Sequence, residues 1–355
     1  MSTPDVYAVI MAGGTGTRFW PASRRAKPKQ FLTIASDRPL IDETFRRLDG
    51  LVPPERILVV TGAAHADEVR AALPQLPEAN LLVEPSAHNT LPCAALAAFE
   101  IRRRCERSIQ ILLPADHIIR PTDRFQASLR AGIETAARDA SFVTFGVQPT
   151  HASTGYGYIE TGAPQAEAQG ESVLAVEAFH EKPDAHRAEA YLESGRHLWN
   201  SGIFIWDSTT FLAELQRQAA HIHDGLADVD PRACDAAYDA LPSVSLDVGL
   251  MEGAGSVRVL PIDYTWDDVG SWSALFDVLS GDSDGHRVVG GAQVASVDSQ
   301  DCVVFGPPGS ITALIGVSDL VVVQTERATL VCPRDRAQDV RRAVEQIRAL
   351  DPTLL

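Results

Sequence analysis

The residues best suited to chemistry stand near the start of the chain, where a glycine turn follows a short apolar segment and precedes several cations. The glycines are Gly13, Gly14 and Gly16, and the cations are Arg18, Lys27 and Lys29. Glycine tolerates positive φ and the close approach of a ligand, so such a turn can direct several backbone N–H groups at one anion. The segment predicts a polyphosphate cradle at the carboxyl end of a first strand; the alternative is a structural turn with solvated cations.

Two better-known phosphate-binding loops do not fit this turn. The dinucleotide-binding pattern G-x-G-x-x-G needs a third glycine, but counting from Gly14 that position is Phe19. The ATP-binding P-loop ends in Gly-Lys-Ser or Gly-Lys-Thr, and neither tripeptide occurs in the chain. The sequence therefore indicates a cradle of another kind.

Two aspartates follow or precede segments that could bring them to the cradle. Asp116 comes just after the apolar segment 109–113, and Asp268 precedes a Val-Gly-Ser turn. Each aspartate alone is more simply a turn residue or a helix cap. Together they offer the hard oxygen ligands that a divalent cation needs beside a triphosphate.

Alternating apolar and amphipathic segments define the fold of the first part of the chain. Predicted strands at 56–61, 80–83, 109–113 and 142–147 alternate with predicted helices at 40–48, 64–73, 92–104 and 124–138. This alternation predicts an α/β fold with a Rossmann-like, doubly wound sheet. From residue 151 the strands are short and separated by loops, which favours a mixed sheet that builds a pocket.

The segment 281–285, Gly-Asp-Ser-Asp-Gly, is the best candidate for a domain boundary. It predicts a catalytic domain over residues 1–280 and a small C-terminal β domain over 286–355. In the latter, short apolar strands, the first at 288–297, precede a charged closing helix over 334–350. Apolar strands in a small terminal domain suit a dimer surface, so we expect a homodimer.

Composition limits the class of protein. The 355 residues carry 31 Lys and Arg against 47 Asp and Glu, a net charge of −16, which argues against nucleic acid as a partner. We expect no membrane association and a cytoplasmic location, because the N-terminus lacks a signal-peptide pattern and no long apolar run occurs. The five cysteines are widely spread, without a C-x-x-C pair, and indicate neither a disulfide framework nor a zinc site.

The string GGTGTRFWPASRRAKPKQF, which begins at Gly13, resembles the signature of the sugar-nucleotide pyrophosphorylases and, more narrowly, of the bacterial mannose-1-phosphate guanylyltransferases. The resemblance covers nearly the whole chain and implies a nucleotide-diphospho-sugar transferase fold with a left-handed β-helix-like C-terminal domain. It implies Mg²⁺ as cofactor, GTP and mannose 1-phosphate as substrates, and GDP-mannose and pyrophosphate as products. It leaves no segment for the cupin-type isomerase domain of bifunctional relatives, so isomerase activity is not expected.

The resemblance also implies a nucleotide site. Arg18 and Lys29 are expected to act in catalysis by holding the β- and γ-phosphates, and Asp116 and Asp268 are expected to hold the metal. His88 and Leu91 stand where the family has arginine and alanine. The expected nucleotide-binding residues are Ala12, Gly13, Gly14, Gly16, Thr17, Arg18, Lys29, Glu84, Pro85, Asn89, Thr90 and Asp116.

Three further motifs, TGYGYIE, FHEKPD and LWNSGIFIW, match the family's sugar side. A carboxylate and an amide can bind hexose hydroxyls, and a lysine can neutralise a sugar phosphate. Lys182 is accordingly expected to act in catalysis by binding the incoming phosphate, although an exposed Glu-Lys-Pro turn is the simpler reading of that motif alone. The expected sugar-phosphate residues are Gly157, Glu181, Lys182, Asn200 and Gly202.

The sequence thus predicts a Mg²⁺-assisted nucleotidyltransferase that forms GDP-mannose. One alternative is a pyrophosphorylase for another hexose or heptose 1-phosphate or for another nucleoside triphosphate. A second, from a different class, is a catalytically silent regulatory subunit that senses nucleotide sugars. The latter should have lost site charges, whereas Arg18, Lys29, Asp116 and Asp268 are all present.

Overall fold

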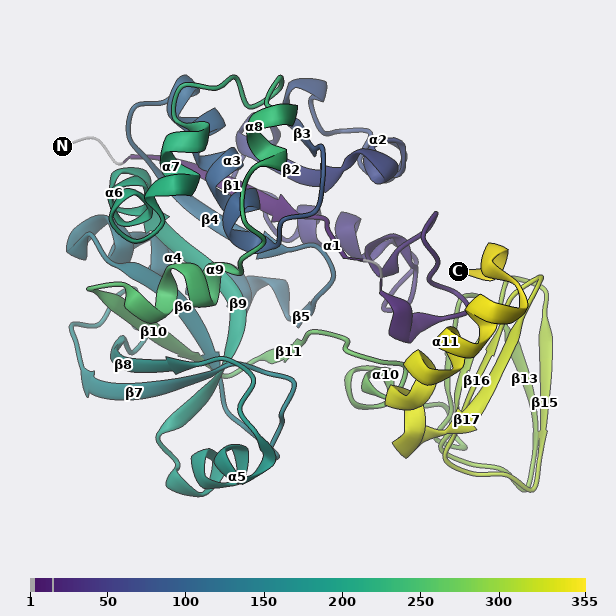
Figure 1. The fold of residues 1–355 in the computed structure, drawn as a ribbon. Helices are drawn as coiled ribbons and strands as arrows, with labels where there is room; N and C mark the ends of the chain where they lie inside the picture. Colours follow the sequence, from purple (N-terminus) through teal and green to yellow (C-terminus); the bar gives the residue numbers. More distant parts are fainter. Residues whose placement is uncertain (1–3, 15) are drawn as a thin grey trace.

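The computed structural model describes residues 4–14 and 16–355. A large mixed sheet forms the body of the molecule, and a smaller β structure with helix α11 lies beside it (Figure 1). The nine strands of the large sheet run in the order β3-β2-β1-β4-β9-β6-β10-β8-β7. Their bounds are β1 (Asp5–Met11), β2 (Ile57–Gly62), β3 (Leu81–Glu84), β4 (Ser108–Pro114), β6 (Phe142–Val147), β7 (Tyr158–Pro164), β8 (Leu174–His180), β9 (His197–Asp207) and β10 (Val257–Ile262).

Helices cover both faces of this sheet, as the strand–helix alternation predicts. Along β1, Tyr7 and Val9 join a core under α3, α6 and α7, while Ala8 and Ile10 join a second core under α1, α2 and α4. Successive side chains of a strand point to opposite faces, so an uninterrupted apolar strand needs cover on both. The bounds are α1 (Leu40–Arg46), α2 (Ala66–Ala72), α3 (Thr90–Arg104), α4 (Thr122–Asp139), α5 (Ala185–Ser194), α6 (Ser208–Gln218), α7 (Ala220–Leu226), α8 (Asp235–Asp239), α9 (Leu246–Gly249), α10 (Ala274–Val278) and α11 (Val340–Leu350).

The strand directions bring distant segments to one edge of the sheet. β1 and β4 are parallel, with Met11 opposite Pro114, so the glycine loop and the segment after β4 leave the sheet at the same edge. β9 runs antiparallel between β4 and β6 and places Asn200 opposite Gly146, near the carboxyl end of β6. Both the cradle and the sugar motif of β9 therefore lie at this edge, and the mixed sheet predicted from the sequence is confirmed.

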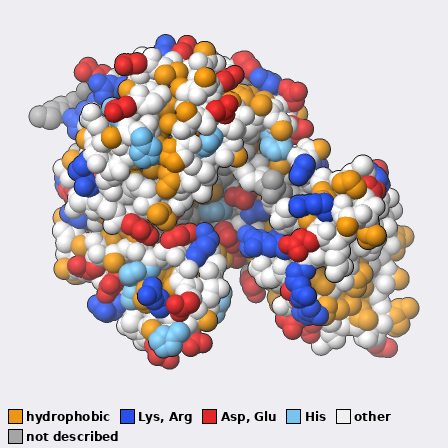
Figure 2. Space-filling view, viewed as in Figure 1, with side chains coloured by type: hydrophobic (Ala, Val, Ile, Leu, Met, Phe, Trp, Pro, Cys, Tyr) orange, Lys and Arg blue, Asp and Glu red, His pale blue; other side chains and the backbone are white. Residues whose placement is uncertain are grey.

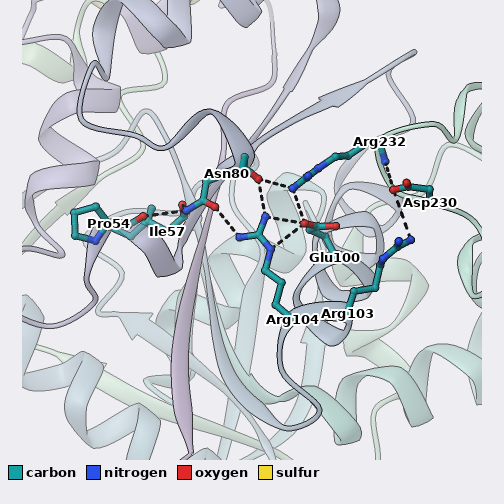
Figure 3. Close-up of polar contacts among 9 residues, drawn as sticks. Pro54, Ile57, Asn80, Glu100, Arg103, Arg104, Asp230 and Arg232 are labelled. Atoms are coloured by element: carbon teal, nitrogen blue, oxygen red, sulfur yellow. Dashed lines mark hydrogen bonds and ion pairs between the residues drawn. The ribbon is translucent and has the colours of Figure 1, made fainter.

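A buried polar network fixes helix α3 at its C-terminal end (Figure 3). The Glu100 carboxylate accepts hydrogen bonds from Arg104 Nη2 and from Arg232 Nη2, both at 2.7 Å. Arg104 also donates to Asn80 Oδ1 at 2.6 Å, and Asn80 in turn donates to the carbonyls of Pro54 and Ile57. Because Glu100 is only 5% exposed, these arginines compensate a carboxylate removed from water.

The C-terminal part is built from parallel strands stacked as successive coils. One sheet has the order β12-β14-β16-β17 and the other pairs β13 with β15, all parallel except β16 with β17. The single strand expected over 288–297 is wrong: positive φ at Gly290 and Gly291 turns the chain between two strands. The bounds are β12 (Arg287–Val289), β13 (Gln293–Val297), β14 (Val303–Phe305), β15 (Ile311–Ile315), β16 (Leu320–Gln324) and β17 (Thr329–Pro333).

The helix expected over 334–350 is α11 preceded by a 3-10 helix over Arg334–Asp339. α11 packs against the segment that leaves the glycine loop. Phe19, Trp20 and Trp272 share a core with Val321 and Val344 of the C-terminal part. Trp20 Nε1 donates to the carbonyl of Leu354 at 3.0 Å. The C-terminal segment therefore packs against the residues that follow the glycine loop.

None of the described helices combines the length and the apolar character that crossing a bilayer requires.

Candidate active site

The glycine loop leaves β1 with its backbone free on one side. A Cβ at Gly13 or Gly14 would meet no heavy atom of the described residues within 4 Å, and Gly14 has a φ of +88°. Gly16, with a φ of +56°, faces the protein instead: a Cβ there would lie 2.7 Å from Lys29 Cβ. Only glycine combines these backbone angles with that close approach. The loop therefore leaves its backbone accessible at Gly13 and Gly14 and packs against Lys29 at Gly16.

Lys29, which follows the glycine loop, contacts both predicted metal-binding aspartates, Asp116 and Asp268. Its side chain is 8% exposed, and its Nζ lies 2.8 Å from Asp116 Oδ2. The same ammonium donates to the backbone carbonyl of Asp268. Burial alone would raise the pKa of Asp116, but the charge and hydrogen bond of Lys29, together with His117 and a backbone hydrogen bond, outweigh it and hold that pKa below its usual value. Asp116 is accordingly an anion at neutral pH.

The turn after β11 (Thr265–Asp267), which pairs with β5 (Ile118–Arg120), positions the second aspartate. Asp268 Oδ1 accepts a hydrogen bond from the Tyr156 hydroxyl at 3.0 Å. Asp267 accepts from the Val269 N–H at 2.5 Å, and Val269 has a φ of +48°, unusual for a β-branched residue. Burial, followed by the charge of Asp268, raises the pKa of Asp267 to about 7.

Arg18 lies at the same edge of the sheet, where its guanidinium contacts Gln338 of the C-terminal part. Its Nη1 lies 3.4 Å from Gln338 Oε1, and burial and the nearby charge of Arg341 lower its pKa. Nη1 is also 3.4 Å from the position a Cβ would take on Gly270, beside Asp268. In Figure 2, Lys and Arg side chains gather around the hollow between the two parts of the molecule.

The segment between β3 and α3 carries the remaining residues that the sequence predicts to bind the nucleotide. Asn89 caps this helix by accepting from the Thr90 N–H at 2.9 Å, and Thr90 Oγ1 accepts from the Leu246 N–H at 2.8 Å. Glu84 accepts a hydrogen bond from the hydroxyl of buried Tyr238, and burial raises the pKa of Glu84. Of Glu84, Pro85, Asn89 and Thr90, Thr90 alone lines the cavity described next.

A cavity of about 190 Å³ opens at this edge of the sheet. Gly157 lies against Glu181, because a Cβ there would be 2.7 Å from Glu181 Oε2. Lys182 stays outside the lining, 64% exposed, with its Nζ 2.5 Å from Glu181 Oε1. The lining residues that the sequence predicts for the site are Thr90, Gly157, Glu181, Asn200, Gly202 and Asp268.

Comparison with known proteins identifies the family of the chain. The family described as Nucleotidyl transferase matches residues 7–285. The chain belongs to this family. A second family, described as MannoseP isomerase/GMP-like beta-helix domain, matches residues 292–347, which agrees with the coiled strands of the C-terminal part.

Several relatives of this nucleotidyl transferase cover nearly its whole length. Mannose-1-phosphate guanylyltransferase of Escherichia coli K12 is 37% identical over 98% of this chain and 75% of its own. Alginate biosynthesis protein AlgA of Pseudomonas aeruginosa is 36% identical over 96% of this chain and 72% of its own. The crystal structure titled mannose-1-phosphate geranyltransferase from Thermus thermophilus superposes with a TM-score of 0.88 at 33% identity, covering 97% of this chain and 99% of that one. The resemblance to the guanylyltransferases and the fold class expected from the sequence are confirmed.

One residue of this site carries no sequence signal. Asp247 lies in the four-residue helix α9, and its Oδ1 accepts from Asn200 Nδ2 at 2.7 Å. Burial, followed by the charge of Glu181, raises the pKa of Asp247 to about 6. Asn200 Oδ1 also accepts from the Gly202 N–H at 3.1 Å. The amide of Asn200 is therefore fixed, with one N–H left to face the cavity.

Tyr156, His117 and Trp266 also line the cavity without having been expected to bind a ligand. The Tyr156 ring packs on Trp266 with centroids 5.6 Å apart, and its hydroxyl reaches Asp268. His117 packs edge-on against Trp266, and burial lowers the pKa of His117 to about 4, so its ring is neutral at pH 7. The two glycines around Tyr156, Gly155 and Gly157, were the available signal, since they allow the backbone to approach a ligand there.

Lys27 is the cation of the cradle segment that the structure places elsewhere. It lines a separate hollow of about 550 Å³ with Arg24, Gln324 and Arg327. The backbones of Arg24 and Lys27 form an isolated antiparallel bridge, which reverses the chain before Lys29. Lys27 therefore faces this hollow, whereas Lys29, two residues later, is buried against Asp116.

The two aspartates fit a divalent cation, which nucleotidyltransferases of this family generally use. Asp268 keeps Oδ2, and Asp116 keeps Oδ1, without a hydrogen bond to another side chain in the described residues. Both oxygens are hard, anionic donors of the kind that Mg²⁺ prefers.

Proposed function

We propose that this chain is a mannose-1-phosphate guanylyltransferase, which forms GDP-mannose and pyrophosphate from GTP and α-D-mannose 1-phosphate. The observation that carries the proposal is the match to enzymes of that name over nearly the whole chain. The convergence of three sugar motifs and the Asp268 turn on one cavity supports it. A silent sensing subunit is disfavoured, because the charged groups of the site are retained.

The reaction joins an oxygen of the sugar phosphate to the α-phosphorus of GTP and breaks the bond from that phosphorus to the oxygen bridging to the β-phosphate. Positioning and charge stabilisation account for most of the catalysis of such a transfer. In our proposal the N–H groups of Gly13, Gly14 and Gly16, together with Arg18 and Lys29, bind the β- and γ-phosphates. These cations offset the charge that accumulates on the leaving pyrophosphate.

The sugar phosphate enters from the opposite side of the cavity. Glu181 and Asn200 bind hydroxyl groups of the hexose, and Lys182 neutralises its phosphate so that two anions can approach. Asp247 holds the Asn200 amide in place for this contact. Gly157 and Gly202 let the backbone come close to the sugar.

We assign the cation to Mg²⁺, held by Asp116 and Asp268. When bound, it neutralises phosphate charge and orients the triphosphate. Arg18, supported by Gln338, holds the adjacent phosphates from the C-terminal side.

The test is a substrate screen in which pyrophosphate release is measured. GTP, ATP, UTP and dTTP are each combined with mannose, glucose and galactose 1-phosphates, and Asp268→Asn serves as the inactive control. We expect the highest kcat/KM for GTP with mannose 1-phosphate. A clear preference for another pair would assign the chain to another pyrophosphorylase, and tight GDP-mannose binding without turnover would revive the sensing role.

The homodimer also remains a proposal. It is supported by apolar side chains that stay exposed on β13 and β15: Val297 at 53%, Ile311 at 66% and Ile315 at 70%. Monomeric proteins rarely leave such side chains clustered in water. Light scattering on the purified chain tests it, with Ile315→Lys expected to shift the mass towards the monomer.

A further inference from the structure

Two histidines and a glutamate meet at a place outside the cavity. They are Glu160 of β7, His180 of β8 and His197 of β9, and one ligand atom from each lies within 4.8 Å of the other two. None of the three lines the active-site cavity. They come from three paired strands, so the framework of the sheet, and not a flexible loop, brings them together.

The strand register explains the cluster. Glu160 pairs directly with His197, and Tyr158, two residues earlier on β7, pairs directly with His180. Residues two apart on a strand, and residues directly opposite on a neighbour, share a face of the sheet. All three side chains therefore project from the same face.

The histidine rings are oriented by their surroundings. The Tyr191 ring of α5 stacks on both, with centroids 4.2 Å from His197 and 4.9 Å from His180. His197 is buried, which lowers its pKa and favours the neutral ring that metals bind. Its Nδ1 lies 2.8 Å from Ser194 Oγ, and within the described residues its Nε2 has no hydrogen-bond partner. A second ring nitrogen held by an outer partner is typical of histidines that bind metals.

We propose that Glu160, His180 and His197 bind one divalent transition-metal ion of the Zn²⁺ type, with water completing the coordination. Two imidazoles and one carboxylate form a common ligand set for this class of ion. Such a site needs ligand atoms about 3.3 Å apart if it is tetrahedral. Glu160 and His180 are half-exposed, so small side-chain rotations can close the distance and water can reach the ion.

One positive charge competes for the glutamate. Arg196 Nη1 lies 3.0 Å from Glu160 Oε1, but the Arg196 side chain is 65% exposed. An exposed pair of this kind contributes little and is screened by salt. The guanidinium can therefore turn into water, and Oε2 of Glu160 remains available in either arrangement.

A metal at this position would hold the strands that supply the sugar side of the cavity. His180 immediately precedes Glu181, and His197 is three residues before Asn200. An ion shared by β8 and β9 would restrict their relative movement. It should also stabilise the folded chain, because the unfolded chain does not assemble the three ligands.

The test uses tag-free protein that has been stripped with a chelator and titrated with Co²⁺ in excess Mg²⁺. Mg²⁺ competes for oxygen ligands such as Asp116 and Asp268 but poorly for imidazole. We expect one Co²⁺ per chain by equilibrium dialysis, with the visible absorption of a nitrogen-ligated ion, and a higher melting temperature with Zn²⁺.

His180→Ala and Glu160→Gln should each weaken Co²⁺ binding at least tenfold and abolish the Zn²⁺-dependent rise in melting temperature. His186→Ala changes an exposed histidine of α5, the helix that supplies the Tyr191 ring; it is the matched control and should bind as the parent does. Failure of the parent to take up Co²⁺ in Mg²⁺ overturns the proposal. So does unchanged binding by both cluster variants, or uptake that is lost only in Asp268→Asn.

Discussion

We call the residues proposed to bind the triphosphate the phosphate side of the site and those proposed to bind the sugar phosphate its sugar side; the two differ in how their cations are held. Lys29 is 8% exposed and lies between Asp116 and the Asp268 carbonyl, whereas Lys182 is 64% exposed and contacts only its neighbour Glu181 among the described side chains. A buried cation with fixed partners is already oriented before a ligand arrives, while an exposed lysine must lose side-chain freedom on binding. In the proposed function the phosphate side is thus preorganised, and Lys182 of the sugar side would become ordered only when its ligand binds.

The largest expected effect follows from removing the buried cation. Lys29→Ala should lower kcat by about 10²–10³, because the variant loses a preorganised positive charge that offsets the negative charge of the leaving pyrophosphate. Lys27→Ala is the matched control and should keep near-parental turnover, since that side chain lines the other hollow. Pyrophosphate release is measured below the melting temperature of each variant. Comparable turnover for Lys29→Ala and the parent would remove Lys29 from the proposed machinery.

How far the sequence specifies these two sides also differs. The glycine loop and its cations form one continuous segment, so their proposed roles follow from spacing and stay predictions. The alternating apolar segments specified the parallel half of the sheet. Asp247 could not be predicted from the sequence. It lies in a four-residue helix, and its partner Asn200 is 47 positions away in the sequence. Lys27 was misplaced for a similar reason: a local chain reversal, absent from the spacing pattern, turns it away.

A smaller effect is expected from the exposed cation of the sugar side. Lys182→Ala should raise KM for the sugar phosphate by about 10–100-fold and leave the affinity for GTP nearly unchanged, because its contact forms only with the incoming phosphate. Initial rates with each substrate varied in turn separate the two constants. Arg187→Ala, an exposed cation on α5, is the control. An equal loss of GTP affinity would contradict the division into two sides.

The raised pKa of Asp247 makes the stability of the sugar side depend on pH. Its folded pKa of about 6 lies above the ordinary 3.8, so the folded chain prefers the protonated carboxyl. The corresponding stability is fully present below the unfolded pKa and is lost as pH rises through about 6, at a cost of up to about 3 kcal/mol. Asp247→Asn removes this titration.

We therefore expect Asp247→Asn to melt higher than the parent at pH 8 and to lose that advantage at pH 4. The same variant should raise KM for the sugar phosphate roughly tenfold, because a neutral amide orients Asn200 less firmly than a carboxylate does. Thermal melts at the two pH values and initial rates check both parts. If Asp247→Asn melted at a lower temperature than the parent at pH 8, the ionised Asp247 carboxylate would stabilise the folded chain, contrary to this prediction.

The smallest effect on chemistry is expected from the polar network around Glu100 at the C-terminal end of α3 (Figure 3), none of whose members lines the cavity. Glu100→Gln keeps the shape of the side chain but leaves Arg104 and Arg232 without their shared carboxylate. Loss of charge-assisted hydrogen bonds at a buried position should cost about 1–3 kcal/mol in the free energy of unfolding, measured by urea denaturation. Turnover per folded molecule should be unchanged, because Asn89 and Thr90 lie at the opposite end of the helix. If kcat also fell tenfold, the N-terminus of α3 would depend on this network for its position, and the phosphate side would owe its preorganisation to contacts well outside the cradle.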